Sequence, residues 1–237
     1  MPMIAGRYRT ERLLKGSEDG ATATWQGRCL STGAPVAIKV VPTGGTEAAL
    51  LQRAAGHEGI VRLVEAIEVP VGDGSVAAGR TVIVTEWCAG GDLAAVIRKR
   101  GALPEPTVIS ILAQLSAALR HLHSLDILHR DVKTRNVFLV DPLDGNIGNP
   151  RVRLGDFGVS RTGGWGDTLL GTPLYLPPEV LEGGRYDRRS EVWALGCLAY
   201  EALTGRAPFT GPGLRDLLRA IRAAKVSWPT AGLVTQG

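Results

Sequence analysis

Residues 129–136 of the chain read HRDVKTRN, and residues 156–158 read DFG. This spacing, H-R-D-x-x-x-x-N followed by D-F-G, fixes seven positions in order and is hard to obtain by chance. The two stretches supply carboxylate and carboxamide oxygens, which Mg²⁺ prefers as ligands, and cations that can stabilise a developing anion. An ordinary polar loop is the alternative interpretation, and motifs elsewhere in the chain disfavour it.

The composition places these motifs in a chain of 237 residues, of which 44% are hydrophobic. That length suits one or two lobes around a sizeable core rather than several domains. The net charge is +4, and acidic residues are spread among the basic ones without a Lys/Arg block. We therefore predict no nucleic-acid partner.

Three widely spaced cysteines, Cys29, Cys88 and Cys197, make neither a disulfide framework nor a zinc site and suit a reducing compartment. The N-terminus lacks the apolar stretch of a signal peptide, and the longest apolar run, residues 192–200, is too short to cross a bilayer. The chain is expected to be intracellular and most simply cytoplasmic, with no membrane insertion. Its oligomeric state is left open.

Short β-prone runs fill the first part of the chain and helical patterns the rest, which indicates an α+β fold. Strands are predicted at residues 8–14, 25–30, 36–41, 61–69 and 80–85. Helices are predicted at residues 46–55, 188–204 and 214–224. Another helix is predicted from one apolar face, formed by Ile109, Leu112, Leu115, Leu119 and Leu122.

Further motifs carry a family resemblance. They are residues 36–39 (VAIK), 85–93 (TEWCAGGDL), 133–139 (KTRNVFL), 171–179 (GTPLYLPPE) and 193–197 (WALGC). Together with HRDVKTRN and DFG, they make the chain resemble eukaryotic-type serine/threonine protein kinases. Gly155 ahead of DFG, and the stretch NVFL, are most similar to the NIMA-related (Nek) group.

The resemblance implies a two-lobed protein kinase-like fold over residues 1–237. Its parts would be a small β-rich N-lobe (about 1–85), a hinge (86–91) and a helical C-lobe (92–237) that is truncated before its last helices. In the family those helices carry an arginine that pairs with the position of Glu179. We therefore expect Glu179 to be a buried carboxylate lacking its partner, at a cost of roughly 3–5 kcal/mol unless another group or chain compensates.

The resemblance also implies ATP and Mg²⁺ as cofactors and assigns the catalytic roles. Asp131 would orient and deprotonate the attacking hydroxyl, and Asn136 and Asp156 would bind the metal ions. Lys133 would stabilise charge on the transferring phosphate, and Thr172 would hydrogen-bond between Asp131 and Lys133.

Nucleotide binding is assigned on the same basis. Lys39 of VAIK would contact the α- and β-phosphates, and Glu47 would pair with Lys39 from the following helix. Because Glu47 follows Lys39 closely, in a short helix, a surface glutamate is the alternative interpretation. The expected adenine-binding residues form an apolar slot, a hinge and a gatekeeper position: Ala37, Thr85, Glu86, Cys88 and Phe138.

Two segments depart from the family pattern. Gly16 and Gly20 are one residue too far apart for the glycine-rich loop, and the acidic residues 18–19 would lie near the expected phosphates. If residues 25–28 fix the register instead, Ser17, Asp19 and Thr22 occupy the glycine positions. In addition, Glu191 stands where the family has aspartate; its longer side chain requires an adjusted geometry.

A regulatory switch is predicted in the segment after DFG. Thr168 lies where family members are often phosphorylated, and a phosphate there adds about −1.5 to −2 charge. Arg130 could pair with that phosphate through two parallel hydrogen bonds and order the segment.

We expect a serine/threonine protein kinase that transfers the γ-phosphate of MgATP to protein substrates. The alternative is a pseudokinase, a binding or scaffold module with weak or no nucleotide turnover. The degenerate glycine-rich loop favours the alternative, whereas intact Lys39, Asp131, Asn136 and Asp156 oppose it. The sequence does not identify the protein substrate or the pathway.

Overall fold

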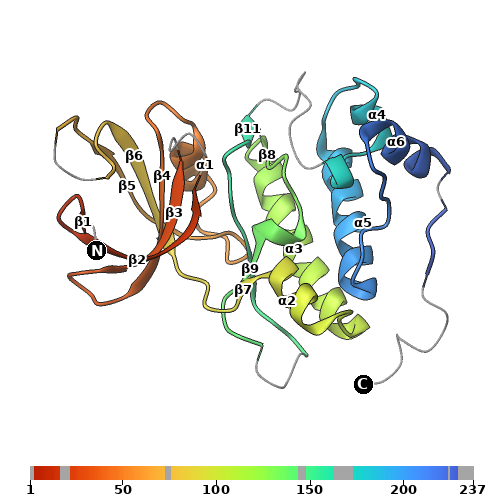
Figure 1. Ribbon diagram of the computed structural model, residues 1–237, viewed down its shortest axis with the longest axis horizontal. Helices are drawn as coiled ribbons and strands as arrows, with labels where there is room; N and C mark the ends of the chain where they lie inside the picture. The colour runs from red at the N-terminus through yellow and green to blue at the C-terminus, as the bar shows by residue number, and fades with distance from the viewer. Residues whose placement is uncertain are drawn as a thin grey trace. The chain divides into compact units, whose positions relative to one another are not determined.

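The computed structural model describes residues 3–16, 22–72, 76–143, 148–162, 173–223 and 225–228. The chain divides into two compact units, one of Met1–Gly56 with Val61–Trp87 and one of His57–Ile60 with Cys88–Gly237. Strands dominate the first unit and helices the second, so the predicted α+β class is confirmed (Figure 1).

The first unit is built on an antiparallel sheet that contains every strand predicted from the sequence. The elements in chain order are β1 (Met3–Ile4), β2 (Tyr8–Gly16), β3 (Ala23–Cys29), β4 (Pro35–Pro42), α1 (Glu47–Arg53), β5 (Leu63–Val69) and β6 (Arg80–Glu86). Along the sheet the order is β1-β2-β3-β4-β6-β5. The hairpins join neighbours in sequence, and only the exchange of β5 and β6 breaks that order.

Strand β4 shows how this sheet positions its polar side chains. Val36, Ile38 and Val40 alternate into the core, where each is less than 5% exposed. Since successive side chains of a strand point to opposite faces, Ala37 and Lys39 lie on the other face of the sheet. The hydrophobic core on the first face, which contains neither Ala37 nor Lys39, consists of Ile4, Tyr8, Val36, Ile38, Val40, Val69, Ala77, Val82 and Val84.

The second unit is mainly helical. Its helices are α2 (Leu93–Arg100), α3 (Glu105–Ser124), α4 (Pro178–Leu181), α5 (Arg188–Thr204) and α6 (Leu214–Ala223), with 3₁₀ turns η1 (Thr134–Asn136) and η2 (Pro173–Tyr175). Short strands β7 (Gly91–Asp92), β9 (Val137–Leu139) and β10 (Val152–Leu154) form one small sheet, in the order β10-β9-β7. Strands β8 (Ile127–Leu128) and β11 (Arg161–Thr162) form another.

Helices α3 and α5 run antiparallel and form the frame of this unit. Leu103, before α3, donates a backbone bond to Ala202 near the end of α5, and Arg188 at the start of α5 reaches the carbonyl of His123 near the end of α3. The bounds predicted for α5 are confirmed. A capping box at Asp187 starts this helix, and Gly205 ends it with φ 75°, a conformation that suits glycine.

The buried face predicted for α3 is wrong at one residue. Ile109 is 58% exposed, whereas Val108 and Ile111 are buried. Leu115, Leu119 and Leu122 are buried as predicted. The error concerns the N-terminal part of the helix, where the neighbouring residues Val108 and Ile109 are both apolar and periodicity alone does not select the buried one.

Gly90 provides a test of the packing between the start of the second unit and β9. A Cβ atom at Gly90 would lie 2.2 Å from the Asp141 carbonyl oxygen and 2.6 Å from the Leu139 Cβ. We expect Gly90→Ala to lower the free energy of unfolding by about 1–3 kcal/mol, because backbone must move. Gly196→Ala, in α5 with no atom within 4 Å of the new Cβ, should instead raise it by about 0.5–1 kcal/mol. Urea unfolding measures both, and equal effects of the two changes would contradict this packing.

Candidate active site

The predicted catalytic residues of the second unit lie on the loop between β8 and η1. The Asp131 carboxylate oxygen Oδ2 lies 2.6 Å from Lys133 Nζ and accepts a 2.8 Å hydrogen bond from Asn136 Nδ2. Asn136 Nδ2 also donates to the Asp131 carbonyl at 2.8 Å. The loop thus closes on itself, and a cation and an amide fix the direction of the Asp131 carboxylate.

His129 joins this loop to the DFG segment. Its ring is fully buried, and its Nδ1 accepts from the Asp131 backbone N–H at 3.3 Å while its Nε2 lies 3.0 Å from the Gly155 carbonyl oxygen. Burial lowers the pKa of His129 and outweighs the nearby carboxylates, so the neutral ring with its proton on Nε2 fits both bonds. Because this pKa is lower in the folded state, the stability that His129 contributes is lost as the pH falls below about 6.5.

Asp156 is held in place by strands on either side of it. Strand β10 precedes it and pairs with β9, and β11 follows it and pairs with β8. Gly155 N–H donates to the Asn136 carbonyl at 2.9 Å, which ties the two predicted metal-binding segments together. Asp156 has φ 62° and Arg130 has φ 67°, values that non-glycine residues adopt at a cost of about 1–3 kcal/mol. Both strained residues therefore lie in or beside the predicted catalytic machinery.

The donor set fits Mg²⁺ better than a transition metal. Asn136 donates both of these hydrogen bonds to Asp131 through its side-chain nitrogen, which leaves the carboxamide oxygen to act as a ligand. Asp156 adds a carboxylate, and Mg²⁺ usually takes one or two such protein ligands together with phosphate and water oxygens. Within the described residues, no group of three His, Cys, Asp or Glu side chains could hold a metal ion.

Glu191 anchors the catalytic loop from α5. It is fully buried; its Oε1 accepts from Arg130 N–H at 2.8 Å, and its Oε2 lies 2.5 Å from His123 Nε2. The sequence predicts an adjusted geometry for a glutamate at this position, and the structure shows what it is. The longer side chain reaches both a backbone N–H of the catalytic loop and the imidazole of His123 on α3. The sequence flagged Glu191 but gave no sign of His123 as its partner.

A further anchor was missed by sequence reasoning. Thr134 Oγ1, at the start of η1, lies 3.1 Å from both Glu201 Oε2 on α5 and the Tyr175 hydroxyl oxygen on η2. The Tyr175 hydroxyl also donates to Glu201, and burial, then this bond, raises the pKa of Tyr175. These residues are far apart in sequence, and no local pattern links them.

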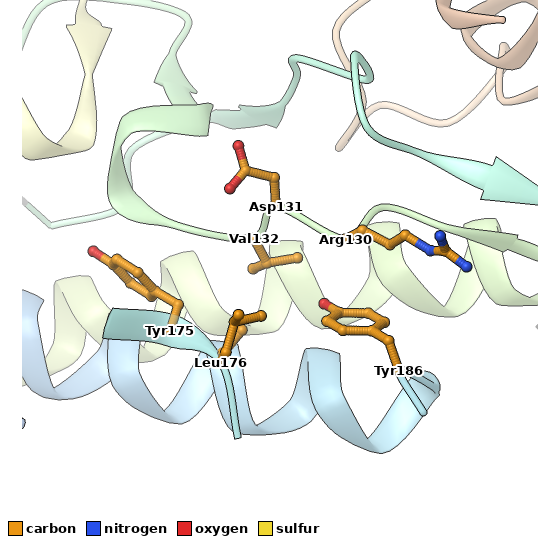
Figure 2. A pocket seen from close by; sticks show the side chains of 7 residues that line it. Arg130, Asp131, Val132, Tyr175, Leu176 and Tyr186 are labelled. Carbon is orange, nitrogen blue, oxygen red and sulfur yellow. The ribbon is translucent and has the colours of Figure 1, made fainter. Parts of the chain in front are cut away.

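Beneath the loop, the packing is tight. A crevice lined by Arg130, Asp131, Val132, Tyr175, Leu176, Tyr186 and Ala194 leaves no room for a water molecule. Figure 2 shows the Asp131 carboxylate on the side away from Tyr175, Leu176 and Tyr186. These side chains therefore form a packed layer that supports the loop, and the Asp131 carboxylate points away from this layer.

The first unit contains the ion pair predicted for the phosphate-binding lysine. Lys39 Nζ donates to both carboxylate oxygens of Glu47 at 2.8 Å. Glu47 is only 7% exposed, so the surface-glutamate interpretation is wrong. The short helix α1 is sufficient to bring Glu47 under β4.

The other predicted nucleotide-binding residues are divided between the units. In the first unit, Ala37 pairs across strands with Thr85, and the Glu86 backbone N–H donates to the Arg62 carbonyl at 3.0 Å. In the second, Cys88 is buried and Phe138 is half-buried in β9. Their roles toward adenine stay predictions.

Three predicted residues, Gly20, Thr168 and Thr172, lie outside the described residues. Gly16 ends β2, is exposed, and has no atom within 4 Å of an added Cβ, so packing does not require glycine there. Arg130 is buried, with its backbone held by Glu191, and its pairing with a phosphorylated Thr168 stays a prediction.

The expectation for Glu179 is wrong. Its side chain is exposed on α4, where water solvates the carboxylate and no partner is required. The expected cost of about 3–5 kcal/mol applies to a buried charge and therefore does not arise.

Comparison with known proteins identifies a family. The Protein kinase domain family matches residues 25–230. Among curated proteins, Serine/threonine-protein kinase ATG1b of Arabidopsis thaliana is 34% identical over 95% of this chain and 32% of its own length. Human Serine/threonine-protein kinase ULK1 is 37% identical over 73% of this chain and 16% of its own. Mouse Serine/threonine-protein kinase Nek3 is 36% identical over 76% of this chain and 33% of its own. The chain spans about a third or less of the length of these relatives.

Proposed function

Because the chain belongs to the protein kinase family, we propose that it transfers the γ-phosphate of MgATP to serine or threonine hydroxyls of protein substrates. The observation that carries the proposal is the closed catalytic loop, in which Lys133 and Asn136 both contact the Asp131 carboxylate. Such an arrangement fixes a general base before a substrate arrives, which is what positioning catalysis requires.

Each of these side chains has a distinct role in the proposed reaction. Asp131 accepts the proton of the substrate hydroxyl, and Lys133 offsets negative charge on the transferring phosphate. Asn136 and Asp156 would hold Mg²⁺, which, when bound, neutralises charge on the phosphate oxygens. Lys39, oriented by Glu47, binds the α- and β-phosphates.

The Lys39–Glu47 pair also bears on the alternative, a pseudokinase. A module that has lost nucleotide turnover has no need for a half-buried lysine paired through both oxygens of a buried glutamate. The degenerate glycine-rich segment favours weak nucleotide binding, but residues 17–21 lie outside the described part of the chain. Measuring nucleotide affinity with and without Mg²⁺ separates the two functions. A kinase should bind the nucleotide together with Mg²⁺, whereas a scaffold module need not couple nucleotide binding to Mg²⁺.

We expect Lys39→Met to lower phosphotransfer by about 100-fold or more and to weaken ATP binding, because it removes a charge that stabilises phosphate oxygens. The measurements are transfer from labelled ATP to a serine/threonine peptide, and ATP affinity by calorimetry. Lys99→Met, at an exposed position of α2, is the matched control and should leave both unchanged. If Lys39→Met retained wild-type transfer, the proposed nucleotide site would be wrong.

The predicted Nek grouping needs correction. The ATG1b relative matches 95% of the chain, against 76% for the Nek3 relative, at similar identity. We therefore place the chain nearer to the ATG1 and ULK kinases than to the Nek group. Its substrates and partners stay open.

An intracellular, cytoplasmic location is also proposed. The three cysteines, Cys29, Cys88 and Cys197, are free thiols, as expected in a reducing compartment. In the described residues, no helix has the length and apolar character required to cross a membrane.

A further inference from the structure

Thr134 lies in the catalytic loop, between the proposed catalytic residues Lys133 and Asn136. It begins η1, and its side chain is only 1% exposed although it carries a hydroxyl group. The Asn136 backbone N–H donates to the Lys133 carbonyl at 3.0 Å, which connects the two ends of this turn. A group that fixes Thr134 therefore also fixes Lys133 and Asn136.

The Thr134 hydroxyl contacts two groups that are distant in sequence. Its Oγ1 donates to Glu201 Oε2 of α5 at 3.1 Å and lies 3.1 Å from the Tyr175 hydroxyl oxygen of η2. The Tyr175 hydroxyl also donates to Glu201. Each hydroxyl has one proton to donate, and a carboxylate only accepts. Both protons therefore go to Glu201, which is the common acceptor for η1 and η2.

Helix α5 provides a fixed position for this acceptor. Glu201 lies between Tyr200 and Ala202, and both of these neighbours are buried. Its backbone carbonyl accepts from the Gly205 N–H at 2.8 Å, so the last turn of α5 is closed around it. By contrast, η1 is a single turn of three residues. The Thr134–Glu201 bond therefore ties a short turn of the catalytic loop to a long, packed helix.

We propose that Thr134 is a positioning residue for phosphotransfer, an inference that rests on the proposed function. Lys133 Nζ lies 2.6 Å from Asp131 Oδ2, and Asn136 Nδ2 donates to the same oxygen at 2.8 Å. A shift of η1 would change both contacts, and the Asp131 carboxylate would lose its direction. Because a misplacement of about 1 Å can lower a rate about 10²-fold, a hydroxyl that prevents this shift contributes to the rate without touching the substrate.

The test measures kcat and the KM values for ATP and a serine/threonine peptide in variants of the full chain. Thr134→Val is nearly isosteric and removes the hydroxyl, so we expect kcat to fall about 10- to 100-fold while KM for ATP stays within about twofold. Thr134→Ser keeps the hydroxyl and should keep kcat within about threefold. Thr204→Val is the matched control, since the Thr204 hydroxyl donates to the Tyr200 carbonyl within α5, and it should leave kcat unaltered.

A double-mutant cycle tests the acceptor. Glu201→Ala should also lower kcat, and Thr134→Val/Glu201→Ala should lower it no further than Glu201→Ala alone, because both changes remove the same bond. Backbone amide exchange adds a readout that does not depend on activity: the Asn136 N–H should exchange faster in Thr134→Val but not in Thr134→Ser. Unfolding midpoints verify that the variants are folded, and Thr134→Ala replaces Thr134→Val if the added methyl group prevents folding.

Three results would overturn this inference. An unchanged kcat in Thr134→Val would show that the hydroxyl has only a structural role. An equal loss in Thr134→Ser and Thr134→Val would show that side-chain shape matters instead of the hydroxyl, and multiplied losses in the double variant would show that Thr134 and Glu201 act independently. In these three cases the unchanged chain still transfers phosphate and the proposed function stands. An unchanged chain that transfers none would overturn the proposed function and this inference together.

Discussion

Replacing Asp131 with asparagine should lower phosphotransfer by about 10²- to 10⁴-fold, the usual contribution of a general base, while ATP affinity stays near its original value. Asparagine is nearly isosteric, and its carboxamide oxygen can still accept from Lys133 and Asn136, which contact Oδ2 in the structure. It cannot take up the proton of the attacking hydroxyl. The measurements are single-turnover transfer to a peptide and ATP affinity by calorimetry.

Asp141→Asn is the matched control for this change. Asp141 is 65% exposed and pairs with Arg151, so the same substitution there should alter neither transfer nor affinity. Substantial transfer by Asp131→Asn would refute the role of Asp131 as the base. A parallel loss of ATP binding would instead show that Asp131 acts on the nucleotide, which the proposal excludes.

Truncating Glu191 should cause the largest loss of stability. Glu191→Ala leaves the buried Arg130 N–H without its acceptor and removes the partner of His123, so we expect a loss of about 2–5 kcal/mol in the free energy of unfolding. Glu191→Asp, which is one methylene shorter, cannot hold both contacts on an unchanged backbone and should lose less. Urea unfolding measures the series.

A double-mutant cycle with His123→Ala isolates the contact between the two helices. Coupling of about 0.5–3 kcal/mol between Glu191 and His123 is expected of residues in direct contact. Glu182→Ala is the control, since Glu182 forms an exposed ion pair with Arg222 that should contribute about 0–1 kcal/mol. Purely additive losses at Glu191 and His123 would contradict the anchor. So would a Glu191→Ala effect as small as that of Glu182→Ala.

Short motifs predicted the candidate site because each motif is local. HRDVKTRN places Asp131, Lys133 and Asn136 on one tight loop, so three of the proposed catalytic side chains lie together whatever surrounds them. The alternation in VAIK likewise places Lys39 on the face opposite the buried valines and isoleucine, since strand side chains alternate. The bounds of α5 followed from its periodicity and the glycine that ends it.

The wrong expectations concern properties that depend on neighbours in space. The sequence predicts Ile109 on the buried face of α3 and Glu179 in the interior, but both side chains are exposed. The sequence does not decide whether Glu47 is buried, because a short helix can hold its first residue toward solvent or toward the sheet. Only the packing of α1 against the sheet decides which of these occurs.

The sequence by itself determined the fold class, the order of the strands along the chain and the loop that carries Asp131. The tertiary structure alone decided which distant groups hold that loop: His123 and Glu191 on two antiparallel helices, and Tyr175 and Glu201 around Thr134. Periodicity and motif spacing report on residues within a few positions of each other, where backbone geometry fixes the distances. Contacts between residues far apart in sequence arise only when the helices pack, and their partners are chosen by that packing.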